Sequence, residues 1–322
     1  CATRPSLSAI FRPLPRTLAF TCGDPAGVGP RAALAAVRAR ALPRGASPLF
    51  VGERAVWVRA GWRPADGPMF DTRLGLAAPA PGRPDANGGR ISAASFEASL
   101  ALCARGLAGG VVTAPSAKEW WAAAGYAYRD HTERLAACTP DGAAEMVLGV
   151  PSLKLWCSLA TRHLPLKEAV RRLDRRSVVQ AARALDAALS ELGVRRPRLA
   201  LCGLNPHAGE GGLIGGEEKS VLAPALAVLR REGLSLHGPL PADSAWRLHL
   251  EGVYDGLVCL YHDQALVPLK ALGGLSGVNW TVGIPFARTS PAHGTAWEAA
   301  RSGRLDASAT IEAARLAARL IG

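Results

Sequence analysis

Short apolar runs that end in glycine, proline, asparagine or aspartate recur along the chain. They occupy residues 17–27, 47–53, 109–118, 153–165, 198–209, 255–264 and 277–289. Between them lie segments rich in alanine, leucine and arginine, whose apolar positions recur with helical spacing, at 31–42, 91–108, 166–192 and 219–233. Strands that alternate with helices predict an α/β protein with a largely parallel central sheet.

The length indicates how this sheet is divided. A chain of 322 residues exceeds the usual size of one domain, so we expect two lobes. Residues 77–90, AAPAPGRPDANGGR, predict a long surface loop. Hydrophobic residues make up 49% of the chain and charged residues 20%, a composition typical of a globular protein and not of a disordered one.

The chain is strongly basic, with a formal net charge of +12 at pH 7. Its basic residues are almost all arginine, they are scattered between apolar positions, and no aromatic-rich basic stripe accompanies them. We therefore expect no nucleic-acid partner, but a solvated basic surface that attracts anionic metabolites.

The cysteines and the N-terminal residues bear on location. The seven cysteines have no CxxC spacing and mostly lie in apolar runs, which predicts reduced, buried thiols. The N-terminal stretch is basic without an apolar core of signal-peptide length, and no apolar run of about twenty residues occurs. We expect a cytoplasmic protein without membrane association.

Three histidines each follow a predicted strand directly: His163, His207 and His262. The carboxyl ends of parallel strands meet at one edge of a sheet, where ligands bind. Any one of these histidines is more often a capping or hydrogen-bonding residue than a ligand. Three at one edge favour an alternative, a three-imidazole site for a divalent ion with positions left open for a substrate oxygen.

Two further segments carry candidate chemistry. Residues 21–30, TCGDPAGVGP, lie between a strand and a helix, but their glycines fit neither GxGxxG nor the P-loop, so a tight turn is the simpler interpretation. Residues 279–300 bring Asn279, Arg288, His293 and Thr295 around a strand and a turn, and a guanidinium such as that of Arg288 suits a carboxylate or phosphate.

Lys270 is one of only five lysines in an arginine-rich chain, which favours a specific role over a solvated cation.

These motifs occur together in a known order. The chain contains GDPAGVGP, VTAPSAK, HTE, TRHLPL, CGLNPHAGEGG, GPLPADS, YHDQ and GIPFARTSPAHGTA, in that sequence, from about Thr17 to Gly322. In this it resembles the 4-hydroxythreonine-4-phosphate dehydrogenase family of pyridoxine 5'-phosphate biosynthesis. GLNPHAGEGG and RTSPAHGTA are each long enough to be specific.

The resemblance implies a fold similar to that of isocitrate and isopropylmalate dehydrogenases, which is α/β and lacks the GxGxxG loop. It implies a homodimer whose active sites use residues from both subunits. We expect a cofactor-side lobe from residues 1–125 and 280–322, and a metal, substrate and dimerisation lobe from residues 126–279.

The resemblance also assigns roles to residues. The family's divalent-metal ligands correspond to His163, His207 and His262, the same three histidines that directly follow predicted strands. Substrate contacts correspond to His131, Thr132, Lys270, Asn279 and Arg288, which would anchor phosphate and carboxylate groups. Asp243 in PADS is a candidate metal ligand, partner of a ligand or proton acceptor, with an ordinary helix N-cap as the alternative, and we assign catalytic roles to Asp243 and Lys270.

The implied substrate is 4-phosphooxy-L-threonine, a phosphorylated hydroxy amino acid. Its C3 alcohol would be oxidised to a β-keto acid that decarboxylates to 3-amino-2-oxopropyl phosphate. The resemblance places the adenosine of a nicotinamide cofactor against His293, Gly294 and Thr295. Glu298 favours NAD over NADP, because a carboxylate accepts from a ribose 2'-hydroxyl and repels a 2'-phosphate. Nitrogen ligands suit zinc, cobalt or manganese better than magnesium, which open positions would still tolerate.

The chain departs from the family pattern at several positions, which leaves other functions open. Arg31 replaces a glutamate, Asp130 a glycine before HTE and Ala265 a glycine after YHDQ, where it would narrow a loop beside His262. Ala292 stands where aspartate is frequent. The alternatives are a related dehydrogenase for a phosphorylated sugar acid or a dihydrodiol, and a non-catalytic protein that binds a ligand.

Overall fold

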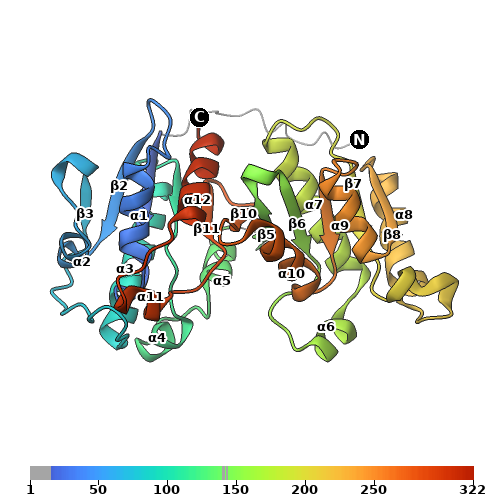
Figure 1. Cartoon of the computed structure of the whole chain (residues 1–322), viewed down its shortest axis with the longest axis horizontal. Coiled ribbons are helices and arrows are strands. Elements are labelled where there is room, and N and C mark those ends of the chain that lie inside the picture. The colour runs from blue at the N-terminus through green and yellow to red at the C-terminus, as the bar shows by residue number, and fades with distance from the viewer. Residues whose placement is uncertain (1–15, 140–141, 143) are drawn as a thin grey trace, which may run out of the picture.

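The computed structural model describes residues 16–139, 142 and 144–322. Eleven strands in this part of the chain form one continuous sheet (Figure 1). In chain order they are β1 (Thr17–Thr21), β2 (Ser47–Gly52), β3 (Met69–Asp71), β4 (Gly110–Val112), β5 (Glu145–Val150), β6 (Leu155–Leu159), β7 (Leu199–Cys202), β8 (Leu236–Leu240), β9 (Gly256–Cys259), β10 (Val278–Val282) and β11 (Ala287–Pro291).

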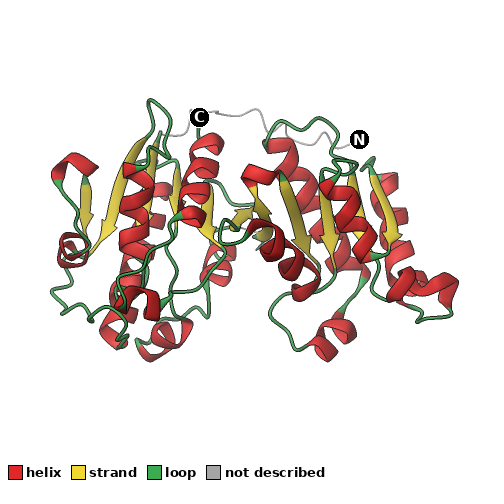
Figure 2. Ribbon diagram, in the orientation of Figure 1, coloured by secondary structure: helices red, strands yellow, loops and turns green. Residues whose placement is uncertain are grey.

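Helices connect these strands, as the alternating pattern predicts (Figure 2). They are α1 (Gly29–Arg38), α2 (Arg54–Arg59), α3 (Ala86–Ala104), α4 (Lys118–Ala123), α5 (His131–Ala136), α6 (Leu166–Arg172), α7 (Arg175–Glu191), α8 (Ala223–Arg231), α9 (Ala242–Leu250), α10 (His262–Gly273), α11 (Trp297–Arg301) and α12 (Ser308–Leu320).

The strands lie in the order β3-β2-β1-β4-β11-β10-β5-β6-β9-β7-β8. Seven of the ten pairings are parallel, so the expected largely parallel sheet is confirmed. The three antiparallel pairings, β11–β10, β10–β5 and β5–β6, lie together at the centre. They divide the sheet into two parallel halves, one on each side of the molecule in Figure 1.

Two tight connections explain the antiparallel centre. The run 277–289 reads as one strand in the sequence, but Gly283, with a φ of +85°, turns it into the hairpin of β10 and β11. The other hairpin joins β5 to β6 through a 3-10 turn at Pro151–Leu153 and the left-handed Lys154. Strand connections this short can only be antiparallel, because a parallel connection needs a crossover.

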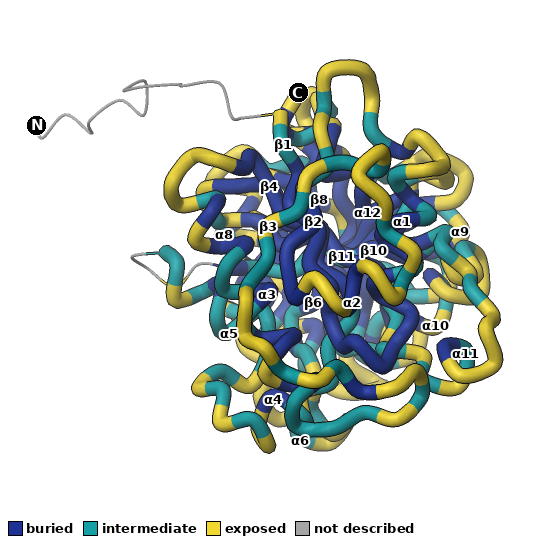
Figure 3. Tube along the Cα trace, turned by 90° about the vertical axis from the view of Figure 1, so that its left-hand side faces the viewer, coloured by how far each residue is buried: buried dark blue, intermediate teal, exposed yellow. Residues whose placement is uncertain are grey.

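Helices cover both faces of the sheet, and the strands between them are buried (Figure 3). Leu18 and Phe20 of β1 point toward a core shared with α1, α7, α8 and α12, whereas Ala19 points toward α3 on the opposite face. All three are fully buried. On the half that holds β6, β7 and β9, that opposite face packs against α9 and α10. Burial on both faces accounts for the continuous apolar runs of the sequence.

Local polar groups set two boundaries that hydrophobic spacing misses. The segment 166–192 reads as one helix but breaks after Arg172, because Asp174 begins a new helix by accepting a hydrogen bond from the amide of Ser177 at 2.7 Å. The loop expected over residues 77–90 ends at Asp85, whose carboxylate accepts from the amide of Gly88 at 2.8 Å and caps α3. Its last residues are therefore helical.

The cysteines of the described residues are free thiols, as expected. Cys22, Cys157, Cys202 and Cys259 are buried, while Cys103 and Cys138 are partly buried. The basic stretch at residues 1–15, which includes Cys1, lies outside the described residues. None of the described helices combines the length and apolar character that crossing a membrane requires.

Gly149 makes the close packing at the centre of the sheet testable. It pairs with Trp156 across β5 and β6, and a Cβ there would collide with the indole ring and lie 2.7 Å from the carbonyl oxygen of Leu155. We expect Gly149→Ala to reduce the free energy of unfolding by about 1–3 kcal/mol, through overpacking. Denaturant unfolding measures this change.

Gly216→Ala is the matched control, because no atom lies within 4 Å of its added Cβ. We expect it to leave stability nearly unchanged. Equal unfolding midpoints for the two variants would contradict the tight packing of Trp156 against β5.

Candidate active site

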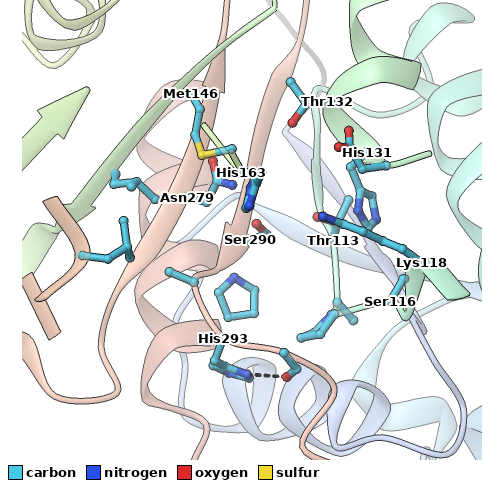
Figure 4. A pocket seen from close by; sticks show the side chains of 18 of the residues that line it. Thr113, Ser116, Lys118, His131, Thr132, Met146, His163, Asn279, Ser290 and His293 are labelled. Atoms are coloured by element: carbon cyan, nitrogen blue, oxygen red, sulfur yellow. Dashed lines mark hydrogen bonds between the residues drawn. The ribbon is translucent and has the colours of Figure 1, made fainter. Parts of the chain in front are cut away.

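A cleft of about 370 Å³ lies between the two halves of the sheet. It is lined from the ends of β4, β6 and β11, the first residues of α5 and one face of α10. In Figure 4, His163 and Asn279 lie on one side, and His131, Thr132 and Lys118 lie on the other. Strand ends from both halves therefore contribute polar side chains to one space.

Two of the three strand-end histidines meet in this cleft. His163 follows β6 with a left-handed φ of +51°, and His262 is the first residue of α10. Their ring centroids are 5.7 Å apart. Withdrawal from water, together with the positive charges of Lys118 and His262, lowers the pKa of His163. A neutral imidazole keeps the lone pair that a metal ion needs, so this pair fits a divalent cation as two of its ligands.

His207 does not join this pair within one chain. It lies exposed in the turn Pro206–Gly212 after β7, outside the cleft. Glu218 holds the start of that turn, since its carboxylate accepts from the amides of Leu204 and Asn205 at 2.9 and 2.8 Å. Among the described residues of a single chain, no group of three histidine, cysteine, aspartate or glutamate side chains is placed to hold a metal.

Asp243 also lies outside the cleft. It is exposed in the first turn of α9, after the N-cap residue Pro241, and the helix has no side-chain cap. The N-cap alternative for Asp243 is therefore wrong. Helix α9 contacts the turn that carries His207, so both residues belong to neighbouring elements at one end of the sheet.

Arg288 is a buried cation in the lining of the cleft. Only 2% of its surface is exposed. Its Nη1 donates to Thr281 Oγ1 at 2.9 Å and its Nη2 to Thr113 Oγ1 at 2.7 Å, whereas Nε has no partner among the described residues. Burial lowers the pKa of Arg288 to about 10, and the charge of Asp130 acts in the opposite direction.

A buried guanidinium with a spare N–H fits an anionic ligand, because buried polar groups in proteins are normally hydrogen-bonded. Its hydroxyl partners are uncharged, so its positive charge is not neutralised by an ion pair among them. The side-chain oxygen of Asn279, which also lines the cleft, is likewise buried without a partner in the described part of the chain.

His131 and Thr132 open helix α5 and line the same wall. The His131 ring packs against Phe96 and Trp121, each with a centroid distance of 4.6 Å. Burial, followed by the charges of Arg288 and Lys118, lowers the pKa of His131 well below its ordinary value. Lys270, in the last turn of α10, is exposed at the mouth of the cleft.

The structure adds lining residues to which sequence reasoning gave no role in the site: Thr113, Ser116, Lys118, Asp130 and Ser290. Lys118 ends the VTAPSAK motif and is one of the five lysines. Lys118 is as unusual in this arginine-rich chain as Lys270, so the scarcity of lysine also indicates a specific role for Lys118.

The expected cofactor turn lies at another wall of the cleft. His293 and Gly294 line the cleft, while Glu298 is exposed on α11. The amide of Val28 donates to the Thr295 carbonyl at 3.0 Å, and a Cβ on Gly27 would lie 2.6 Å from that oxygen. The glycine-rich segment 21–30 is therefore a tight strand-to-helix turn, as its spacing predicts, and it packs against the 293–296 turn.

The departures from the family pattern lie in different environments. Arg31 donates to the carbonyl of Gly303 at 2.9 Å and is not part of the cleft lining. Ala265 lies inside α10 and is fully buried, so the expectation that it narrows a loop is wrong. Asp130 and Ala292 do line the cleft.

Comparison with known proteins gives consistent matches along the chain. The family model "Pyridoxal phosphate biosynthetic protein PdxA" matches residues 51–317. A 4-hydroxythreonine-4-phosphate dehydrogenase of Paracoccus denitrificans (strain Pd 1222) is 41% identical over 316 residues, which covers 94% of this chain and 97% of the relative.

Solved structures agree. The crystal structure of 4-hydroxythreonine-4-phosphate dehydrogenase from Klebsiella pneumoniae matches with a TM-score of 0.81 and 33% identity, covering 95% of this chain and 99% of that one. A terephthalate 1,2-cis-dihydrodiol dehydrogenase from Burkholderia xenovorans LB400 matches with a TM-score of 0.64 and 27% identity, covering 94% and 97%. The chain therefore belongs to the PdxA family of 4-hydroxythreonine-4-phosphate dehydrogenases.

Proposed function

We propose that this chain is an NAD-dependent, divalent-metal-dependent dehydrogenase that oxidises 4-phosphooxy-L-threonine in pyridoxal phosphate biosynthesis. One observation carries the proposal: a single cleft is lined both by two neighbouring imidazoles and by a buried guanidinium, that of Arg288. A substrate that chelates a metal through an alcohol and also carries anionic groups matches this arrangement.

The charges of the cleft match the anionic groups of the substrate. Phosphate and carboxylate need cationic or N–H partners, and Lys118, Lys270 and Arg288 line the cleft together with the amide of Asn279. His131, held neutral, binds such a group as a hydrogen-bond donor and not as a cation. Thr132, beside it at the start of α5, adds a hydroxyl. These contacts hold C3 of the substrate toward His163 and His262.

The third imidazole comes, in this proposal, from a second copy of the chain. His207 is exposed on a turn held by Glu218, and Leu213 at the end of that turn is 86% exposed, as expected of a surface that another chain covers. Asp243, on the adjoining α9, would enter the same shared site. A homodimer related by a two-fold axis completes both of its clefts in this way.

The residues fit a divalent metal and a nicotinamide. When bound, a metal ion supplies Lewis acidity, which favours loss of the C3 hydroxyl proton and later polarises the ketone, while NAD accepts the hydride. Zinc, cobalt and manganese suit imidazole ligands, and magnesium remains compatible with the open positions. His293, Gly294 and Thr295 would hold the adenosine and Glu298 the ribose hydroxyls, with NADP the weaker alternative.

The reaction then balances without another reactant. The C3 alcohol gives a hydride to NAD and a proton to a base, for which Asp243 and Lys270 are the candidates. The resulting β-keto acid breaks its C1–C2 bond to release carbon dioxide, and a proton added at C2 gives 3-amino-2-oxopropyl phosphate.

Turnover with metal removal and restoration tests this function. After chelator treatment we expect no reduction of NAD with 4-phosphooxy-L-threonine, and recovery when zinc, cobalt, manganese or magnesium is restored. Oxidation of a phosphorylated sugar acid or a dihydrodiol instead would move the chain to a related dehydrogenase. Metal binding without turnover of any of these substrates would favour a non-catalytic role.

Mixing two inactive variants tests the shared site. His163→Ala and His207→Ala alone should each lose nearly all metal-dependent turnover. In a heterodimer, one cleft takes His163 and His262 from the first chain and His207 from the second, so an equimolar mixture should recover about a quarter of wild-type activity. If the mixture stays inactive while each variant still dimerises, the three histidines do not form a shared site.

The electrostatics of His131 give a pH prediction. Its pKa is depressed below 6.5, so as the pH falls the unfolded chain takes up this proton first. The contribution of His131 to stability is complete above pH 6.5 and is lost as the pH falls through its lowered pKa. Lys118→Met removes a repelling cation, so we expect an imidazole NMR titration to show a higher pKa for His131, with Lys154→Met, outside the cleft, as a control without effect.

A further inference from the structure

Gln264 joins the turn that carries His262 to the turn that carries His207. It lies in the first turn of α10, outside the cleft lining, and only 8% of its surface is exposed. Its Oε1 accepts from the amide of Leu260 at 2.7 Å, and its Nε2 donates to the carbonyl oxygen of Gly203 at 2.8 Å. Leu260 follows β9 and Gly203 follows β7, so one side chain spans two strand ends.

Both partners of the Gln264 side chain are backbone groups with fixed roles. A backbone N–H can only donate and a carbonyl oxygen can only accept, so the two ends of the side-chain amide cannot be exchanged. The backbone carbonyl of Gln264 accepts from Trp246 Nε1 at 3.0 Å, which ties α9, the helix of Asp243, to the same residue. Three elements that carry proposed site residues therefore meet at Gln264.

The peptide group between Gly203 and Leu204 is held on both sides. Its carbonyl oxygen accepts from Gln264, and its N–H donates to Glu218 Oε1 at 2.9 Å. Glu218 is 7% exposed and opens the π-helical turn that precedes α8, a rare form that is frequent at functional sites. The start of the His207 turn is thus connected to Gln264 by an unbroken chain of polar contacts.

The backbone of the His207 turn makes it dependent on these contacts. Residues 207–211 all have left-handed φ values, between +42° and +76°. His207, Ala208 and Glu210 among them are not glycine, and a left-handed backbone is unfavourable for any residue with a side chain. The turn is also largely exposed, so little packing supports it. Its conformation therefore depends on how its first residues are held.

In the shared site proposed above, these contacts connect the two clefts of the dimer. His262 serves the cleft of its own chain, whereas His207 of the same chain serves the cleft of its partner. A metal ion in one cleft thus fixes His262 of one chain and His207 of the partner subunit. In each chain Gln264 passes this restraint to the histidine that belongs to the second cleft. The second cleft is then better ordered before its own ion arrives.

We propose that Gln264 couples the two metal sites of the dimer, so that binding of the first divalent ion favours binding of the second. The inference rests on the proposed function, in which two chains share each metal site, and it gives Gln264 a positioning role. Its physical basis is conformational entropy, because an ion that meets ligands already ordered has less freedom to remove than the first ion had. Loss of the Gln264 side chain removes this advantage without removing any ligand.

Calorimetric titration of the metal-free dimer with cobalt measures the coupling. Chelator-treated protein is used at a concentration at which it is wholly dimeric, and the dissociation constants of the first and second ion are fitted separately. We expect the second ion to bind the wild type at least about fivefold more tightly than the first, after correction for the statistics of identical sites.

Gln264→Met is the decisive variant, because methionine fills a similar space but has no amide to donate or accept. It breaks the bonds to Leu260 and Gly203 and leaves the contact of Trp246 with the backbone carbonyl in place. We expect both ions to bind it with equal affinity after the same correction. Gln264→Asn, whose amide satisfies one partner but is one carbon too short to span both, should fold readily and lose the coupling as well.

Thr161→Val is the matched control. The Thr161 hydroxyl donates to the carbonyl oxygen of Leu260 at 2.7 Å, so valine removes a buried hydrogen bond of the same strand end. That bond joins β9 to the end of β6, which carries His163, and His163 and His262 serve the same cleft. We expect Thr161→Val to lower stability while the ratio of the two dissociation constants stays that of the wild type.

The outcomes separate this inference from the function on which it rests. A merely structural role for Gln264 weakens both ions alike, so an unchanged ratio in a Gln264 variant that still dimerises overturns the coupling. Loss of the preference in Thr161→Val also overturns it, because any buried contact of Leu260 would then suffice. Independent or weaker binding of the second ion to a wild type that oxidises 4-phosphooxy-L-threonine overturns the coupling alone. A wild type that neither binds cobalt nor oxidises this substrate overturns both proposals.

Discussion

The reversal of strand direction at the centre of the sheet is the constraint on which the cleft depends. In a sheet with all strands parallel, every carboxyl end lies along one straight edge. Here β10 and β5, each antiparallel to both of its neighbours, separate the two parallel halves, and the twist from strand to strand rotates one half against the other. The strands of both halves end on the lower side of the molecule in Figure 1. The loops after β4 and β11 thereby face those after β6 and β9 across a space lined by both halves.

The same arrangement of strands determines where the positive charge of the cleft lies. Arg288 stands on β11, inside the sheet, where a guanidinium is costly to bury unless its N–H groups are satisfied. Threonine hydroxyls from β10 and the end of β4 satisfy two of its nitrogens without cancelling its charge. The positive charge of Arg288 thus lies in surroundings of low dielectric constant within the cleft. An anionic ligand is attracted much more strongly to it there than to the solvated arginines of the surface.

The sequence predicted the alternation of strands and helices because continuous apolar runs are typical of strands buried on both faces. It selected His163 and His262 correctly as neighbours, since β6 and β9 are adjacent and parallel. It did not predict the hairpins, because Gly283 and Lys154 reverse the chain through backbone conformation and not through a change in hydrophobic pattern. The place of His207 directly after a strand did not distinguish it from His163 and His262. The left-handed backbone of the turn after β7 sets it apart, and such a conformation produces no hydrophobic periodicity in the sequence. Asp130 reads as an ordinary N-cap until the tertiary structure brings it to the cleft.

The exposed turn of His207 has a further consequence if the metal site is assembled from two chains. Metal binding and association of subunits are then linked equilibria, and each must strengthen the other by the same free energy. Dilution would weaken retention of the metal, and scarcity of metal would weaken the dimer. The concentration of the protein in a cell would therefore help to decide how much of it is loaded, independently of any change in the histidines themselves.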